Sequence, residues 1–176
     1  MAVNENLNHH SKPKSPKVVS REFARAAGFE IVKASSIPYD EVARNFRRLE
    51  RTYLPHLAEH PSLALEIKRR ISEHLLEQAI LHGCSQQTCR SRLSVALRLG
   101  FTNIEQEAHY RLLYAKGALA RGHMQIAKKT ASEMVRKLRR SLKKRRSLLG
   151  QQCLTVTQKF LDHLGDDGRL AEVPGK

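Results

Sequence analysis

The sequence is poor in aromatic side chains. Of its 176 residues, 5% are aromatic and none is tryptophan, whereas 40% are hydrophobic. A core of this composition must be built mainly from Leu, Ala, Ile and Val, which pack well between helices. So many apolar residues exclude a fully disordered chain, and the lack of a short repeat excludes collagen-like and mucin-like chains.

Long hydrophobic runs and paired cysteines are also missing. No apolar run approaches the about 20 residues that a membrane-spanning helix needs, and the first residues lack the apolar segment of a secretion signal. Three cysteines, Cys84, Cys89 and Cys153, are too few and odd in number for a disulfide framework. We therefore expect an intracellular protein, cytoplasmic or, in a eukaryotic cell, nuclear.

Turn residues punctuate an otherwise helical pattern. Apolar residues recur every three or four positions, as in the stripe of Val42, Phe46, Leu49, Tyr53 and Leu57. Helix starts or stops are expected at Ser20, Gly28, Pro38, Pro61, Gly83, Ser85, Gly100, Thr102 or Asn103, and Gly122.

The pattern predicts one all-α domain of antiparallel helical hairpins, either a bundle or a short solenoid. It extends over residues 20–165, between a flexible, basic N-terminal tail (1–19) and a flexible C-terminal tail (166–176). The stretch 29–37 has no strand partner, so we interpret it as an extended connector between the first two helices.

Negative charge is scarce, and the positive excess is concentrated in one segment. The chain has 32 Lys and Arg against 17 Asp and Glu, a net charge of +15. Residues 124–146 contain ten of the cations and one acid, Glu133. On a helix their apolar residues form one narrow stripe and most cations cover the opposite side. The candidate contact residues are Lys128, Lys129, Arg136, Lys137, Arg139, Arg140, Lys143, Lys144 and Arg146.

Such a surface favours an anionic partner. Phosphate contacts by Lys and Arg release counterions and need no precise base geometry, so DNA or RNA is the favoured partner. An acidic protein surface and a simply solvated face remain alternatives. Membrane binding is disfavoured because the apolar stripe is narrow and lacks Trp and Phe.

Small residues in the second half of the chain carry a family resemblance. Tyr114, Ala115, Ala118, Gly122, Ala127, Ala131 and Met134 keep the spacing of the small and apolar positions in one tetratricopeptide unit. Over residues 111–139 the chain resembles such a helix–turn–helix, although Arg111, Ala131 and Arg139 depart from its pattern. The resemblance implies an adaptor with a protein-binding groove between helical hairpins, which is the alternative function.

Motifs for catalysis, metal or cofactor binding are not evident. Neither G-x-G-x-x-G nor G-x4-G-K-[ST] occurs. His56 and His60 flank a helix break before Pro61, and Cys84 and Cys89 lack the C-x2-C spacing of zinc knuckles. We therefore predict a binding protein rather than an enzyme, with no catalytic residues, no metal and no cofactor.

Overall fold

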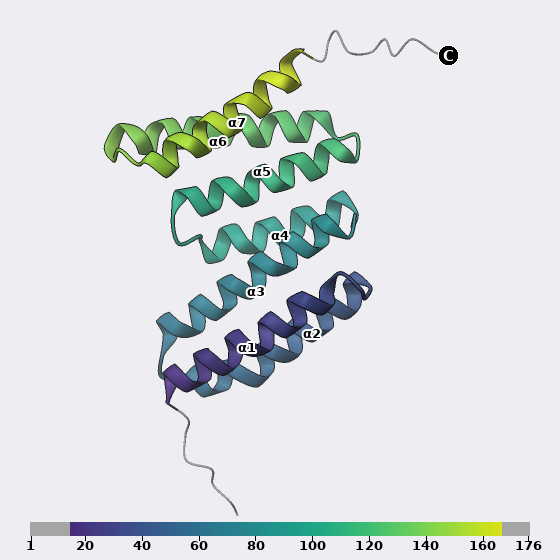
Figure 1. Cartoon of the computed structure of the whole chain (residues 1–176), viewed down its shortest axis with the longest axis vertical. Helices are drawn as coiled ribbons and strands as arrows, with labels where there is room; N and C mark the ends of the chain where they lie inside the picture. Colours follow the sequence, from purple (N-terminus) through teal and green to yellow (C-terminus); the bar gives the residue numbers. More distant parts are fainter. Residues whose placement is uncertain (1–14, 167–176) are drawn as a thin grey trace, which may run out of the picture.

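Seven α-helices, packed as antiparallel neighbours, make up the part of the chain that the computed structural model describes, residues 15–166 (Figure 1). This architecture confirms the predicted all-α fold. The helices are α1 (Pro16–Ala34), α2 (Tyr39–Tyr53), α3 (Pro61–Leu81), α4 (Gln86–Leu99), α5 (Ile104–Ala120), α6 (Met124–Lys144) and α7 (Leu148–Asp166), and a short 3₁₀ turn, Leu54–Leu57, follows α2. The predicted tails fall largely on residues 1–14 and 167–176, which lie outside the described residues.

Local chemistry sets most helix boundaries where the sequence predicts them. The Ser85 hydroxyl accepts a hydrogen bond from the Thr88 amide at the start of α4, and the Asn103 side chain accepts one from the Gln106 amide at the start of α5. These bonds satisfy amides that the first turn of a helix leaves unpaired. Gly122 ends the α5 region with a positive φ of 78°, a conformation that favours glycine.

The first helix is longer than expected. The sequence pattern predicts a helix from Ser20 to Gly28 and an extended connector over 29–37, but α1 runs from Pro16 to Ala34. A proline is favourable at the first helical position because its missing N–H has no partner there anyway. The prediction of an extended connector is therefore wrong for residues 29–34. The prediction of a flexible tail is wrong for residues 16–19, which form the first turn of α1 and include the buried Val19.

Tertiary packing explains why Gly28 does not end α1. A glycine in the middle of a helix costs about 0.5–1 kcal/mol relative to alanine. Ala27 and Ala34, on either side of it, are 5% and 0% exposed and belong to the core shared with α2 and α3. Burial of these residues offsets the conformational cost, and the helix continues.

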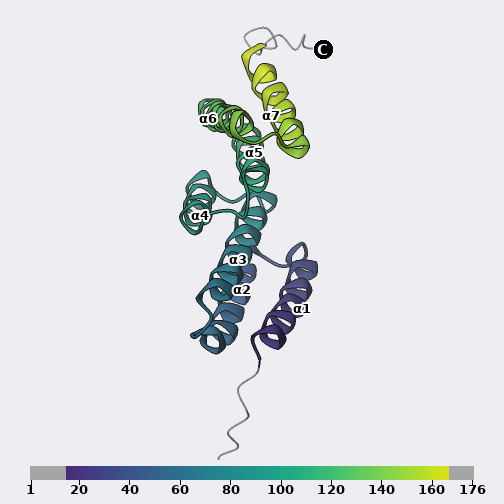
Figure 2. The ribbon, with the colours of Figure 1, turned by 90° about the vertical axis from the view of Figure 1, so that its left-hand side faces the viewer.

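The helices are arranged in a row with lateral additions. The odd-numbered helices contact one another in succession, α1 with α3, α3 with α5 and α5 with α7. Each of α2, α4 and α6 packs between its two neighbours in the chain. Figures 1 and 2 show α4 and α6 projecting on one side of the row, with α2 displaced from α1 in the same direction.

No helix among residues 15–166 combines the length and the apolar composition needed to cross a lipid bilayer.

Candidate functional site

Helix α6 is fixed by two neighbours, α5 on one side and α7 on the other. The side chains that face these two helices are buried, which agrees with the predicted apolar stripe. The buried residues are Ala127, Thr130, Ala131, Met134, Val135 and Leu138. Leu142, also expected in the stripe, is half-buried. The opposite half of the helix surface is therefore presented to solvent.

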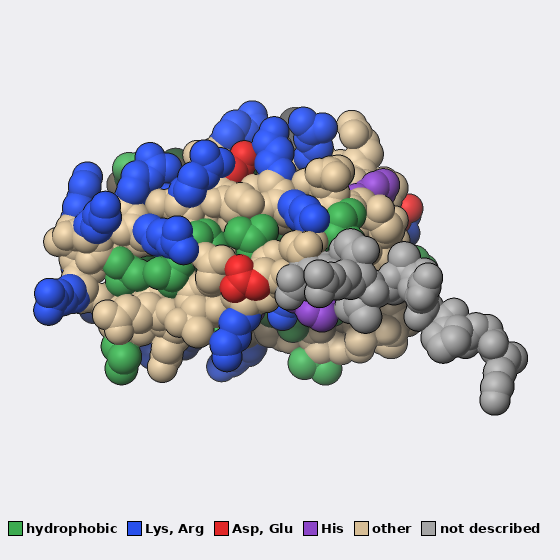
Figure 3. All heavy atoms as spheres, turned by 90° about the horizontal axis from the view of Figure 1, so that it is seen from above, with side chains coloured by type: hydrophobic (Ala, Val, Ile, Leu, Met, Phe, Trp, Pro, Cys, Tyr) green, Lys and Arg blue, Asp and Glu red, His purple; other side chains and the backbone are tan. Residues whose placement is uncertain are grey.

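Four cations lie along the line farthest from the buried stripe. Lys129, Arg136, Arg140 and Lys143 fall within about 60° of arc at 100° per residue, and all four are exposed. We call them the α6 ridge. None of them forms an ion pair with an acidic side chain of residues 15–166. Viewed from the α6–α7 end of the molecule, Lys and Arg side chains gather along the edge formed by α6 (Figure 3).

One predicted contact residue is engaged by the neighbouring helix α5. Lys137 Nζ donates a hydrogen bond to Glu107 Oε2, and Arg111 Nε donates one to Glu107 Oε1 at 2.9 Å. Arg111 also lies 3.5 Å from the Glu133 carboxylate of α6. Glu107 is 7% exposed, so these cations compensate a buried charge. Lys137 is thus partly structural.

The other flank of α6 meets α7. Arg139 Nη2 donates a hydrogen bond of 2.9 Å to Gln158 Oε1, and Lys128 is half-buried. At the C-terminal end of α6, Lys144 is the last helical residue. The sequence predicts that Arg146 lies on this helix, but it lies in the link to α7. Of the nine predicted contact residues, the α6 ridge and Lys144 are the helical ones that are exposed and make no described hydrogen bond or ion pair with another side chain. Within the ridge, Arg140 Nε donates a hydrogen bond of 3.3 Å to the backbone carbonyl oxygen of Arg136.

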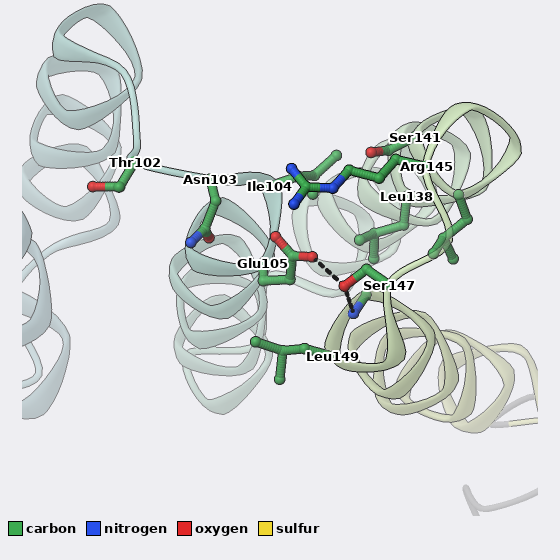
Figure 4. Close-up of a pocket in the computed structure, with 11 residues that line it drawn as sticks. Thr102, Asn103, Ile104, Glu105, Leu138, Ser141, Arg145, Ser147 and Leu149 are labelled. Carbon is green, nitrogen blue, oxygen red and sulfur yellow. Dashed lines mark hydrogen bonds between the residues drawn. The ribbon is translucent and has the colours of Figure 1, made fainter.

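A pocket of about 500 Å³ lies where α6 turns into α7 (Figure 4). Ser147 begins α7 there, donating a hydrogen bond of 2.8 Å to Glu105 Oε1 and accepting one from the Gly150 amide. The Arg145 side chain reaches over the pocket toward Glu105. Because the carboxylate of Glu105 already occupies the helix start, the pocket is better suited to stabilising the turn than to binding an anion.

A second pocket, between α3 and the start of α5, contains titratable groups. Glu73 is buried and accepts a hydrogen bond of 2.9 Å from Gln106, and burial raises the pKa of its carboxyl. Burial also lowers the pKa of the adjacent His74, whose Nδ1 has no hydrogen-bond partner. Both shifts favour the neutral forms and follow from desolvation.

The three thiols lie in environments that disfavour their ionised form. Burial raises the pKa of Cys84, Cys89 and Cys153. Cys89 is fully buried, and its Sγ lies 3.6 Å from the carbonyl oxygens of Ala79 and Cys84. A nucleophilic cysteine requires the opposite shift, toward the thiolate.

Sequence reasoning missed a second cationic surface, on α2. Arg44, Arg47, Arg48 and Arg51 are all exposed on the side opposite the buried Val42, Phe46 and Leu49. The spacing of these arginines, with neighbours three or four positions apart, was the available indication. A charge count does not reveal this surface, because Asp40, Glu41 and Glu50 leave the segment with a net charge of only +1.

Within residues 15–166, no three His, Cys, Asp or Glu side chains converge in a way that would hold a metal ion. Comparisons with protein-family models, curated proteins and solved structures found no match to this chain.

Proposed function

We propose that this chain is a non-enzymatic binding protein that contacts the phosphate backbone of DNA or RNA through the α6 ridge. The observation that carries the proposal is the α6 ridge itself, four exposed cations in one line without an acidic partner among the described residues. Arg140 follows Arg136 by one turn and precedes Lys143 by three residues, so these like charges repel one another by a few tenths of a kcal/mol per pair. A polyanion along the ridge relieves this repulsion.

The position of α6 supports a polyanion rather than a lipid surface. An amphipathic helix binds a membrane by inserting its apolar face. In α6 that face is already buried against α5 and α7, with Ala127 and Leu138 at 0% exposure. Only the cationic side is available to a partner.

The length of the ridge suits repeated charges. Lys129 and Lys143 are separated by 14 positions, or about 21 Å at 1.5 Å per residue. A duplex advances about 3.4 Å per base pair, so the ridge matches about six base pairs. Contacts of this kind fix position along the backbone and carry little sequence information.

A salt titration tests the proposal. Fluorescence anisotropy with a labelled random-sequence duplex of about 24 base pairs, and with a single strand of the same length, is measured between about 50 and 200 mM salt. About five phosphate contacts on α6, from the α6 ridge and Lys144, contribute about 4.5 to the magnitude of the negative log–log slope on the duplex.

The decisive variant replaces Arg136, Arg140 and Lys143 by Gln. Loss of three contacts should reduce the slope by about 2.7 and weaken binding at every salt concentration. A matched control replaces three exposed cations on other helices, Arg21, Arg25 and Lys116, by Gln. Unchanged affinity in the ridge variant, or an equal loss in the control, overturns the proposal.

A second candidate is a docking groove for a protein segment, as the tetratricopeptide resemblance implies. It is favoured by an apolar hollow of about 180 Å³ between α5 and α7, lined by Ala108, Leu112, Cys153 and Val156 among others. Binding in such a hollow depends little on salt, because it buries apolar surface rather than releasing counterions. A flat salt titration with an isolated partner distinguishes it from phosphate binding.

A further inference from the structure

The positive charge of the helices is concentrated in α6 and α4, whereas α2 has a net charge of +1 and α1 of +2. α2, α4 and α6 contain four, three and eight Lys or Arg, against three, none and one Asp or Glu. The row α1, α3, α5 and α7 contains four, three, two and one cations against two, three, two and two acids. Most of the excess charge of the helices therefore lies on α4 and α6, which Figure 2 shows to one side of the row, whereas α2 overlaps α3 in that view.

The α2 surface resembles the α6 ridge in its geometry. Arg44, Arg47 and Arg51 lie within about 60° of arc at 100° per residue, and all are exposed. None of the three forms an ion pair with an acidic side chain of the described residues, whereas their neighbour Arg48 lies 3.6 Å from Glu30. Asp40 and Glu41 lie in the first turn of α2, where negative side chains interact favourably with the helix dipole. The arginines lie further along the helix.

Helix α4 lies between these two surfaces. Arg92 Nε on α4 donates a hydrogen bond of 2.7 Å to the Tyr39 hydroxyl at the start of α2. Tyr39 at the start of α2 and Ile126 at the start of α6 both pack against the core cluster beneath α4. α4 itself contains no acid and exposes Arg90 and Arg98. A polyanion that crosses from α6 to α2 therefore meets no carboxylate of α4.

We propose that α2 provides a second phosphate-contacting surface, formed by Arg44, Arg47 and Arg51, and that α4 joins it to the α6 ridge along one path for a single nucleic acid. This inference rests on the proposed function of α6 and extends it to a long ligand. A duplex of about six base pairs covers the α6 ridge alone, so the additional surface is useful only to a longer strand. The binding site for such a ligand is then formed by α2, α4 and α6 together, and contacts on each of these helices contribute to its affinity.

The test uses the full chain and the random-sequence duplex of about 24 base pairs. An α2 variant replaces Arg44, Arg47 and Arg51 by Gln, which leaves the Arg48–Glu30 pair intact. The control variant replaces Arg21, Arg25 and Lys116 by Gln, so that both proteins lose three charges. Circular dichroism and thermal unfolding establish that both variants keep the wild-type fold.

We expect the α2 variant to bind about tenfold more weakly than the control, with a log–log salt slope smaller by about 2 to 3. Binding by the α2 variant within twofold of the control overturns the inference. If the α6 ridge variant then still loses binding, the proposed function stands without it. If the wild-type chain does not bind the duplex, both proposals are overturned.

Discussion

Lys137 on α6 donates a hydrogen bond to the buried carboxylate of Glu107 on α5, 30 positions earlier in the sequence. The cation is 47% exposed at its side chain and the acid 10%. The bond therefore joins a charged surface to the helix interface beneath it, and it separates the cations of α6 into structural and free ones.

This relationship predicts that substitution of Lys137 affects stability more than substitution of the ridge. In Lys137→Met, Glu107 keeps Arg111 but loses one of its two cationic donors, which should cost about 1 kcal/mol in the free energy of unfolding. Lys143→Met, on the ridge, should change it by less than about 0.5 kcal/mol. Urea denaturation of both variants measures the difference, and equal stabilities would show that the bond contributes nothing.

The glycine in the middle of α1 predicts a stabilising substitution. A Cβ at Gly28 meets no atom within 4 Å, and the residue has helical backbone geometry. Gly28→Ala should therefore raise the free energy of unfolding by about 0.5–1 kcal/mol through helix propensity and a less flexible unfolded chain.

Gly122 supplies the matched control for that substitution. A Cβ added at Gly122 would also meet no atom within 4 Å, but the φ of this residue is 78°. Gly122→Ala should destabilise the protein by about 1 kcal/mol, because L-residues rarely adopt this conformation. Thermal unfolding of the pair gives shifts of opposite sign if the backbone conformation decides the outcome, and a loss of stability in Gly28→Ala contradicts the placement of α1.

A close approach of α3 and α5 predicts a steric effect at Gly117. A Cβ there would lie 2.8 Å from Ile80 Cγ2. Gly117→Ala should cost about 1–3 kcal/mol in stability because the core must shift to admit it. The cost should be smaller in an Ile80→Ala background, since that change removes the obstructing methyl group. A double-mutant cycle measures the coupling, and additive losses would contradict the contact.

His74 predicts a loss of stability on mild acidification. Its pKa is lowered from 6.5, mainly by burial and also by Arg70, while Glu77 acts in the opposite direction. The unfolded chain therefore binds more protons than the native chain between the lowered pKa and 6.5. The contribution of His74 is fully present above about pH 7.5 and is lost as the pH falls through 6.5 toward the lowered value.

Urea midpoints measured from about pH 7.5 to 5.5 test this direction. His74→Phe removes the titrating group beside Phe46, whose ring centroid lies 5.9 Å from that of His74. The stability of the variant should vary less with pH than that of the wild type. Since Glu73 is present in both proteins, its own titration cancels in the comparison. Parallel pH profiles would contradict the assignment to His74.

Features that depend on neighbouring residues were predictable from the sequence. Ser85 and Asn103 cap their helices through bonds to amides three positions later, and this local chemistry can be deduced from a few residues. The cationic surface of α6 was predictable for the same reason, since helical periodicity alone separates its apolar and basic sides.

Features that depend on distant residues were not predictable. Gly28 has the residue type that ends many helices, and only the packing of Ala27 and Ala34 against other helices keeps α1 intact. In the candidate site, the bonds of Lys137 to Glu107 and of Arg139 to Gln158 join positions 30 and 19 apart. Each bond joins residues of two different helices, so the periodicity of a single helix cannot distinguish the free cations from the engaged ones.

The way in which each helix contacts only its near neighbours in the chain has a mechanical consequence. Every helix–helix contact among the described residues joins helices that are adjacent in the chain or separated by one helix. No contact ties the first helix to the last, so tension applied at the two ends passes through each interface in series. Such a chain should lengthen in several small steps, with a terminal helix detaching first, in contrast to a closed bundle that opens at once. A ligand that binds α2 and α6 together would hold closed the helix interfaces between them. The protein would then extend under tension in fewer, larger steps.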